Sequence, residues 1–174
     1  EEVNASGGIN GRNLEVVFED DQCTGAPAAS AVTKLITADK VPAILGSVCS
    51  SATLPAAPIA EKNKTVLLSY CSTAPTITDA GDYVFRDVPS DLFQGTFAAR
   101  HVYNTLGKKK VALVYVNNDW GNGLKKAFGE EFKKLGGEVV SVSTDTVYTH
   151  KGWVGSEQLI SGLAYPMAAD HNGV

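Results

Sequence analysis

Residues 41–75 read VPAILGSVCSSATLPAAPIAEKNKTVLLSYCSTAP, and this stretch decides the fold. Two short apolar runs, 41–45 and 66–70, predict strands that are buried on both faces. The segment 53–62 between them predicts a helix, with Pro55 near its start. A strand, a helix and a second strand joined by short connections indicate a parallel sheet.

The same alternation continues on both sides of this stretch. Residues 14–18 place Leu14, Val16 and Phe18 at every second position, which predicts a strand. Further strands are expected at 83–85, 111–116 and 138–142, and helices at 26–39, 90–106 and 123–135. The chain therefore predicts an α/β fold in which helices cover both faces of a parallel sheet.

The composition narrows the function. The chain has 174 residues, of which 44% are hydrophobic and 20% charged, with a net charge of −4. These values are ordinary for a globular protein and exclude disordered and collagen-like classes. No apolar run approaches the roughly 18 residues of a membrane span, so no membrane insertion is expected. The basic residues are scattered, which argues against a nucleic-acid partner.

Two loops at the carboxyl ends of the predicted strands are candidates for ligand binding, because parallel sheets bind ligands at that edge. The loop at 46–53 reads GSVCSSAT and places hydroxyl groups and backbone N–H groups at a helix N-terminus, where a carboxylate can bind. The loop at 71–75 places further hydroxyl groups at the same edge. Plain capping of the helix is the alternative interpretation.

A third strand end carries Trp120 in the segment 117–123, which reads NNDWGNG. This side chain is either a lid on the next helix or an apolar wall for a ligand. No catalytic set emerges, because no histidine has a metal ligand at the usual spacing and the segment 46–50 lacks the glycine frame of a nucleophile elbow. Phosphate-loop and dinucleotide fingerprints are missing as well. We therefore expect a protein that is not an enzyme and needs no cofactor or metal.

The chain contains three cysteines, Cys23, Cys49 and Cys71. Cys23 and Cys49 each follow a predicted strand, so the two could meet at one sheet edge within disulfide range. A disulfide would indicate an oxidising compartment, whereas two buried thiols would fit a cytosolic protein. Cys71 is expected to be a small buried residue.

Several segments, taken in order over residues 1–147, resemble the start of bacterial periplasmic leucine/isoleucine/valine-type binding proteins. They are GGINGR at 7–12, EDDQC at 19–23, GSVCSSAT at 46–53, STAP at 72–75, FR at 85–86, DLFQG at 91–95 and NDWG at 118–121. The resemblance implies a type I periplasmic-binding-protein fold, in which two Rossmann-like lobes close on an amino acid. It also implies delivery of that ligand to an ABC permease in the inner membrane.

The resemblance assigns roles to residues of the first lobe. It implies that Cys23 and Cys49 form a disulfide. It also implies that Ser50 holds the ligand carboxylate. The backbone of Cys71 and Thr73 would contact the carboxylate and amino groups of the ligand.

Two further roles would come from the second lobe. Trp120 occupies the position of an aromatic residue that lines the ligand. The segment 152–157, GWVGSE, resembles a later part of that lobe, in which a glutamate receives the ammonium group of the ligand. Glu157 would be that residue, and an unrelated tail is the alternative.

The resemblance also divides the chain. Residues 1–107 would form most of lobe one without its first strand, 108–147 would begin lobe two, and 148–174 are a tail of uncertain origin. We therefore expect an incomplete fold in a partial chain whose signal peptide has been removed. The expected location is the periplasm or, in a Gram-positive or archaeal source, the cell exterior as a membrane-anchored lipoprotein.

The leading hypothesis is an extracytoplasmic solute-binding protein for a branched-chain amino acid or a related amide. A ligand-sensing receptor or regulator module on the same fold is the first alternative. A flavodoxin-like enzyme or response domain is the second, and it would need a catalytic acid, a phosphate loop or a nucleophile at the strand ends. Hydroxyl and amide groups stand there instead.

Overall fold

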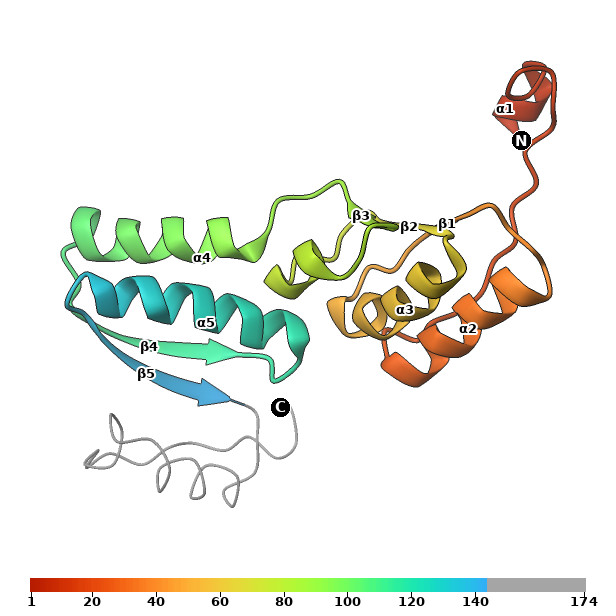
Figure 1. Ribbon diagram of the computed structural model, residues 1–174. Coiled ribbons are helices and arrows are strands. Elements are labelled where there is room, and N and C mark those ends of the chain that lie inside the picture. Colours follow the sequence, from red (N-terminus) through yellow and green to blue (C-terminus); the bar gives the residue numbers. More distant parts are fainter. Residues whose placement is uncertain (144–174) are drawn as a thin grey trace.

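The computed structural model describes residues 1–143. Its elements form two bodies placed side by side, with α1 at the end of an extended segment that leads away from them (Figure 1). The elements are α1 (Glu2–Ala5), α2 (Gly25–Thr37), β1 (Ala43–Leu45), α3 (Ser50–Asn63), β2 (Val66–Ser69), the 3-10 helix η1 (Pro75–Asp79), β3 (Val84–Arg86), α4 (Asp91–Arg100), the π-helix η2 (His101–Thr105), β4 (Lys110–Tyr115), α5 (Asp119–Lys134) and β5 (Glu138–Ser143).

The first body is a parallel sheet in the order β1-β2-β3, packed against α2 and α3. Ile44, Leu67 and Val84 lie side by side in its register and are all buried. They share one core with the apolar faces of both helices, where small alanines allow α3 to lie close to the sheet. The predicted α/β fold with parallel strands is confirmed.

The opposite face of this sheet carries a second row, formed by Leu45, Leu68 and Phe85. Leu45 is 71% exposed and Phe85 is 49% exposed. Within residues 1–143, the helices therefore cover one face of the first sheet rather than the two faces that the sequence predicts.

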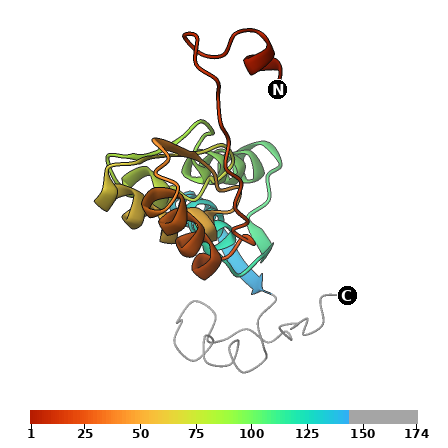
Figure 2. The same ribbon diagram turned by 90° about the vertical axis from the view of Figure 1, so that its right-hand side faces the viewer.

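The second body pairs β4 with β5 in parallel and packs α5 and α4 above them (Figures 1 and 2). Phe132 of α5 is fully buried and forms a T-shaped pair with the Tyr103 ring at a centroid distance of 5.6 Å. Gly95 lets α4 approach α5 closely, because a Cβ atom there would lie 2.7 Å from the Cβ of Ala127. α4 and η2 thus pack with the second core.

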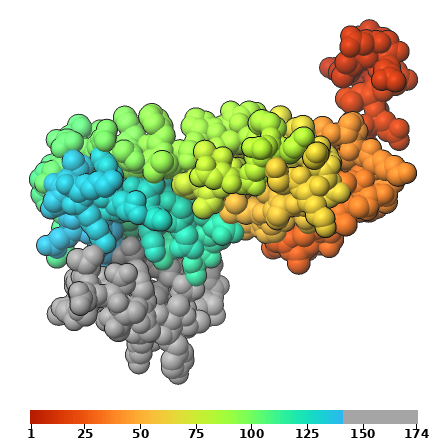
Figure 3. All heavy atoms as spheres, viewed as in Figure 1, coloured from red at the N-terminus to blue at the C-terminus, as the bar shows by residue number. Residues whose placement is uncertain are grey.

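The strand predicted at 14–18 is wrong. This segment is extended but pairs with no described strand, and Phe18 is 87% exposed. A strand needs a neighbouring strand with which its backbone can form hydrogen bonds. Here the Leu14 N–H donates to Asn4 Oδ1 at 2.7 Å, and Asn4 Nδ2 donates to the Leu14 carbonyl at 2.8 Å. These bonds tie the segment to α1, which stands apart from both bodies (Figure 3).

Two helices begin earlier than the sequence predicts. α5 begins at Asp119 rather than at 123, because the Asn118 side chain accepts a hydrogen bond from the Gly121 N–H at 2.9 Å and caps the helix. α3 begins at Ser50 rather than at 53. As a result, Ser50 and Trp120 lie in the first turns of helices and not in the loops before them.

Candidate functional site

The loops that follow β1 and β2 are joined by buried hydroxyl groups. The Ser69 hydroxyl donates to the carbonyl of Ser47 at 2.6 Å. The Ser72 hydroxyl lies 3.1 Å from the same carbonyl and 2.8 Å from the hydroxyl of Thr53. All four residues are buried. This network was not predicted from the sequence, and it holds the two loops of the candidate site together.

Ser50 connects the first turn of α3 to the loop after β2. Ser50 is 3% exposed, and its Oγ accepts a hydrogen bond from the N–H of Ala74 at 3.2 Å. Because a serine hydroxyl also carries one proton, this oxygen can still donate. The first N–H groups of a helix add positive partial charge at the same place. The surroundings of Ser50 therefore suit a carboxylate.

Thr73 lies in the neighbouring loop and is held by two charged residues. Its Oγ1 donates to Oδ2 of Asp91 at 2.8 Å, and the Asp91 N–H donates to the Thr73 carbonyl at 2.9 Å. Arg86 Nη1 donates to the carbonyls of Thr73 and Ala74 at 3.3 and 2.8 Å. The loop is thus fixed from β3 and from the start of α4.

Asp91 is 1% exposed, and its Oδ1 has no hydrogen-bond partner among the described residues. Burial raises the pKa of its carboxyl group, while the hydrogen bond from Thr73 and the charge of Arg86 act in the opposite direction. The sequence assigned no role to Asp91, because an acid directly after the capping Ser90 resembles an ordinary first-turn residue. The signal in the sequence that could have indicated a buried acid at this position was Arg86, at the end of the preceding strand.

Trp120 belongs to the second body and is 42% exposed. It lines a cavity of about 360 Å³ together with residues of α4, β4 and α5. The preceding Asp119 N–H donates to the hydroxyl of Ser51 at 3.3 Å, which brings the first turns of α3 and α5 together. A second close approach joins α5 to η1, because a Cβ atom at Gly123 would lie 2.7 Å from Cδ of Pro75.

The predicted disulfide between Cys23 and Cys49 is present in the structure, with a Cα–Cα distance of 5.3 Å. It links the segment before α2 to the residue that precedes α3. The expectation that Cys71 is buried is wrong, because this residue is exposed and its thiol is free. Its backbone N–H reaches Ser69 Oγ at 3.4 Å. Glu157 lies outside the described residues.

These cysteines give a direct chemical test. Denatured protein that has not been reduced should react with one equivalent of a thiol reagent such as dithionitrobenzoate, because Cys71 is the free cysteine. Prior reduction should raise the count to three, and Cys71→Ser should lower the unreduced count to none. Three reactive thiols without a reductant would contradict the disulfide.

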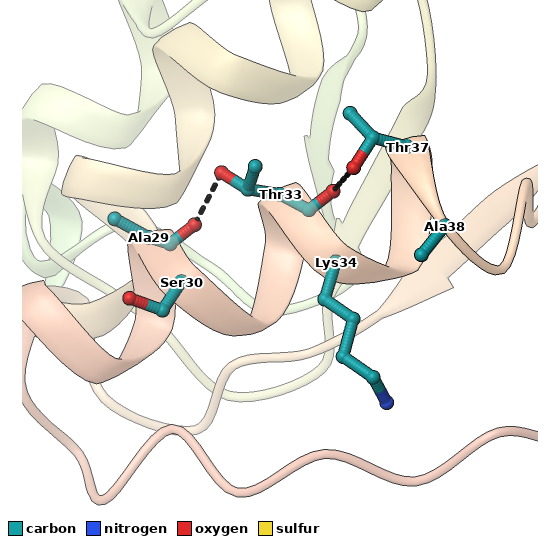
Figure 4. Close-up of a pocket in the computed structure, with 6 residues that line it drawn as sticks. All are labelled: Ala29, Ser30, Thr33, Lys34, Thr37 and Ala38. Atoms are coloured by element: carbon teal, nitrogen blue, oxygen red, sulfur yellow. Dashed lines mark hydrogen bonds between the residues drawn. The ribbon is translucent and has the colours of Figure 1, made fainter.

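A second hollow lies on the outer face of α2 (Figure 4) and offers little to a ligand. The hydroxyls of Thr33 and Thr37 each donate at 2.7 Å to a carbonyl one turn earlier, so their protons are already used. Lys34 pairs with Glu19. In residues 1–143, no group of three or more His, Cys, Asp or Glu side chains could hold a metal ion. No helix in the same range is long and apolar enough to cross a membrane.

Comparison with known proteins gives consistent matches. An amino acid binding protein of Pseudomonas aeruginosa is 35% identical over 137 residues, which are 78% of this chain and 37% of that protein. The crystal structure of a leucine binding protein of Thermotoga maritima superposes with a TM-score of 0.76 at 32% identity, covering 88% of this chain and 45% of the other.

A branched-chain amino acid transporter substrate binding protein of Streptococcus pneumoniae, solved in complex with isoleucine, gives a TM-score of 0.70 at 34% identity, covering 90% of this chain and 46% of the other. The chain thus spans less than half the length of these relatives. The family model described as periplasmic binding protein matches residues 1–149. The resemblance drawn from the sequence is confirmed, and the chain belongs to the periplasmic binding protein family.

Proposed function

We propose that the natural protein captures a branched-chain-type amino acid between two lobes and delivers it to an ABC permease. The observation that carries this proposal is the position of Ser50, whose hydroxyl can still donate at the N-terminus of α3, directly beside the loop of Thr73. Relatives that bind leucine and isoleucine support the choice of ligand.

Each group of the ligand has a proposed partner. Ser50 and the first N–H groups of α3 bind the carboxylate, which matches their donor character. Thr73 and the backbone of Cys71 contact the amino group, and Glu157 is a second acceptor for it. Trp120 forms the apolar wall that meets the side chain.

Closure of two lobes accounts for the contacts between the two bodies. The bond from Asp119 to Ser51 and the packing of Gly123 on Pro75 are contacts that closing lobes would make. Ser50 is buried in the arrangement in which α3 and α5 are joined, so the ligand would enter when the lobes separate. The sequence placed the lobe boundary at residues 107–108, whereas the core that α4 shares with α5 favours a boundary before α4.

The proposed location is the periplasm or the outer surface of the cell, where the Cys23–Cys49 disulfide is stable. The permease is the proposed partner, and no catalytic role is assigned. A sensor module on the same fold is the alternative.

The test is calorimetry on the natural protein at its full length. Leucine, isoleucine or valine should bind with a Kd of about 1 μM or lower, and aspartate should not bind, because the apolar wall cannot pair its second carboxylate. If no amino acid bound, the proposal would be rejected. Deletion of the gene should abolish uptake of the labelled ligand, whereas a sensor would leave uptake intact and change only a downstream response.

A further inference from the structure

We propose that Asp91 fixes the direction in which the Thr73 hydroxyl makes hydrogen bonds, so that the site accepts the ammonium group of an amino acid and rejects the same acid without its amine. This inference rests on the proposed function and names the residue that selects the ligand class. Asp91 acts here as a positioning residue, through Thr73.

The Thr73 hydroxyl faces a ligand as an acceptor. A threonine hydroxyl has one proton to donate and two lone pairs that accept. Its proton points to Asp91 Oδ2 at 2.8 Å, and an ionised carboxylate can only accept. The Thr73 oxygen is then left with lone pairs alone. Towards a ligand it is an acceptor, which suits an ammonium group and not a carboxylate.

The surroundings of Ser50 contrast with those of Thr73. There the hydroxyl oxygen accepts from the Ala74 N–H at 3.2 Å and keeps its own proton. The two hydroxyls, one in the first turn of α3 and one in the loop after β2, thus have opposite character: that of Ser50 can donate and that of Thr73 can only accept. A zwitterion carries the matching pair of groups, since its carboxylate accepts and its ammonium donates.

The backbone of Thr73 is held in place by its neighbours. The Asp91 N–H donates to its carbonyl at 2.9 Å, and Arg86 holds the carbonyls of Thr73 and Ala74. Asp91 itself is 1% exposed and leaves Oδ1 without a partner among the described residues. Burying such a group is unfavourable for folding, as its raised pKa also indicates. An unfavourable charge beside a candidate site is typical of a functional requirement.

The experiment compares leucine with isocaproate, which is leucine without its amino group. Affinities are measured by calorimetry at neutral pH on the full-length natural protein, on Asp91→Asn, on Thr73→Val and on the double variant. Asp87→Asn is the matched control, because it makes the same change at an exposed aspartate four residues away. Melting temperatures verify that each variant is folded.

The wild type should prefer leucine to isocaproate. Asp91→Asn should weaken leucine binding by about tenfold or more, because a charged acceptor is replaced by a weaker neutral one, and should change isocaproate binding by less than about threefold. Thr73→Val should lose the preference in the same way. The double variant should lose no more affinity for leucine than Thr73→Val alone, because Asp91 acts through the Thr73 hydroxyl.

Three results would overturn the inference. Equal losses for both ligands in Asp91→Asn would show a purely structural role, and additive losses in the double variant would show that Asp91 meets the ligand directly. An unchanged preference in Asp91→Asn, with leucine still bound, would reject the inference while leaving the proposed function intact. If the wild type bound no amino acid, the proposed function itself would be rejected. If Asp91→Asn fails to fold, a Thr73→Val variant that keeps the preference overturns the inference by itself.

Discussion

Loss of the Cys23–Cys49 disulfide is expected to lower the free energy of unfolding of the first body by about 3.5 kcal/mol. The two cysteines are 26 residues apart in sequence, and the bond restricts a loop of that length in the unfolded chain. The loop entropy at this length gives the expected value. A loss of this size is a large part of the 5–15 kcal/mol that typically stabilises a domain.

The measurement is denaturant unfolding of the full-length natural protein with and without a reductant. A variant carrying Cys23→Ser and Cys49→Ser should unfold at the lower denaturant concentration under both conditions. Cys71→Ser is the control and should behave like the wild type, because its thiol is exposed and unbonded. Equal unfolding midpoints for the oxidised and reduced wild type would contradict the expected stabilisation.

The same bond bears on ligand binding, because Cys49 is the residue directly before α3. Reduction frees the first turn of α3, where Ser50 lies, and ordering that turn again on binding has an entropic cost. We therefore expect weaker leucine binding after reduction, even at temperatures where the protein stays folded.

The sequence was most informative where the structure depends on local pattern. The alternation of short apolar runs with helices predicted β1, α3 and β2 correctly, because strands buried in a parallel sheet are continuously apolar. The segment 14–18 failed because a strand is defined by its neighbour, and no pattern within the segment shows whether a neighbour is present. Helix starts were misplaced where a side-chain cap, such as Asn118, decided the first turn.

The candidate site was predictable to the same degree. The rule that parallel strands end at one edge of a sheet correctly placed Ser50 beside the loop of Thr73, because the two segments follow neighbouring strands. The role of Asp91 could not be predicted, because it depends on the first turn of α4 meeting the loop of Thr73, and no local pattern encodes that contact. For the same reason, Cys71 was expected in the interior and lies at the surface.

Ser50→Ala is expected to weaken leucine binding by roughly 10- to 100-fold, because it removes a hydrogen bond to a charged group worth about 1.5–3 kcal/mol. The change also leaves the Ala74 N–H without its acceptor, so stability should fall by about 1–3 kcal/mol. Calorimetry and thermal unfolding measure the two effects separately. Ser30→Ala, at an exposed serine on α2, is the matched control and should change neither.

The choice of ligands makes this prediction specific. Isocaproate keeps the carboxylate, so Ser50→Ala should weaken it as much as it weakens leucine. Leucinamide lacks the carboxylate, so Ser50→Ala should leave its affinity almost unchanged. Asp91→Asn should give the opposite pattern, since it acts on the amine and spares isocaproate. If Ser50→Ala weakened leucinamide and leucine equally, Ser50 would only support the fold of the loop, and the carboxylate would have to bind elsewhere in the cleft.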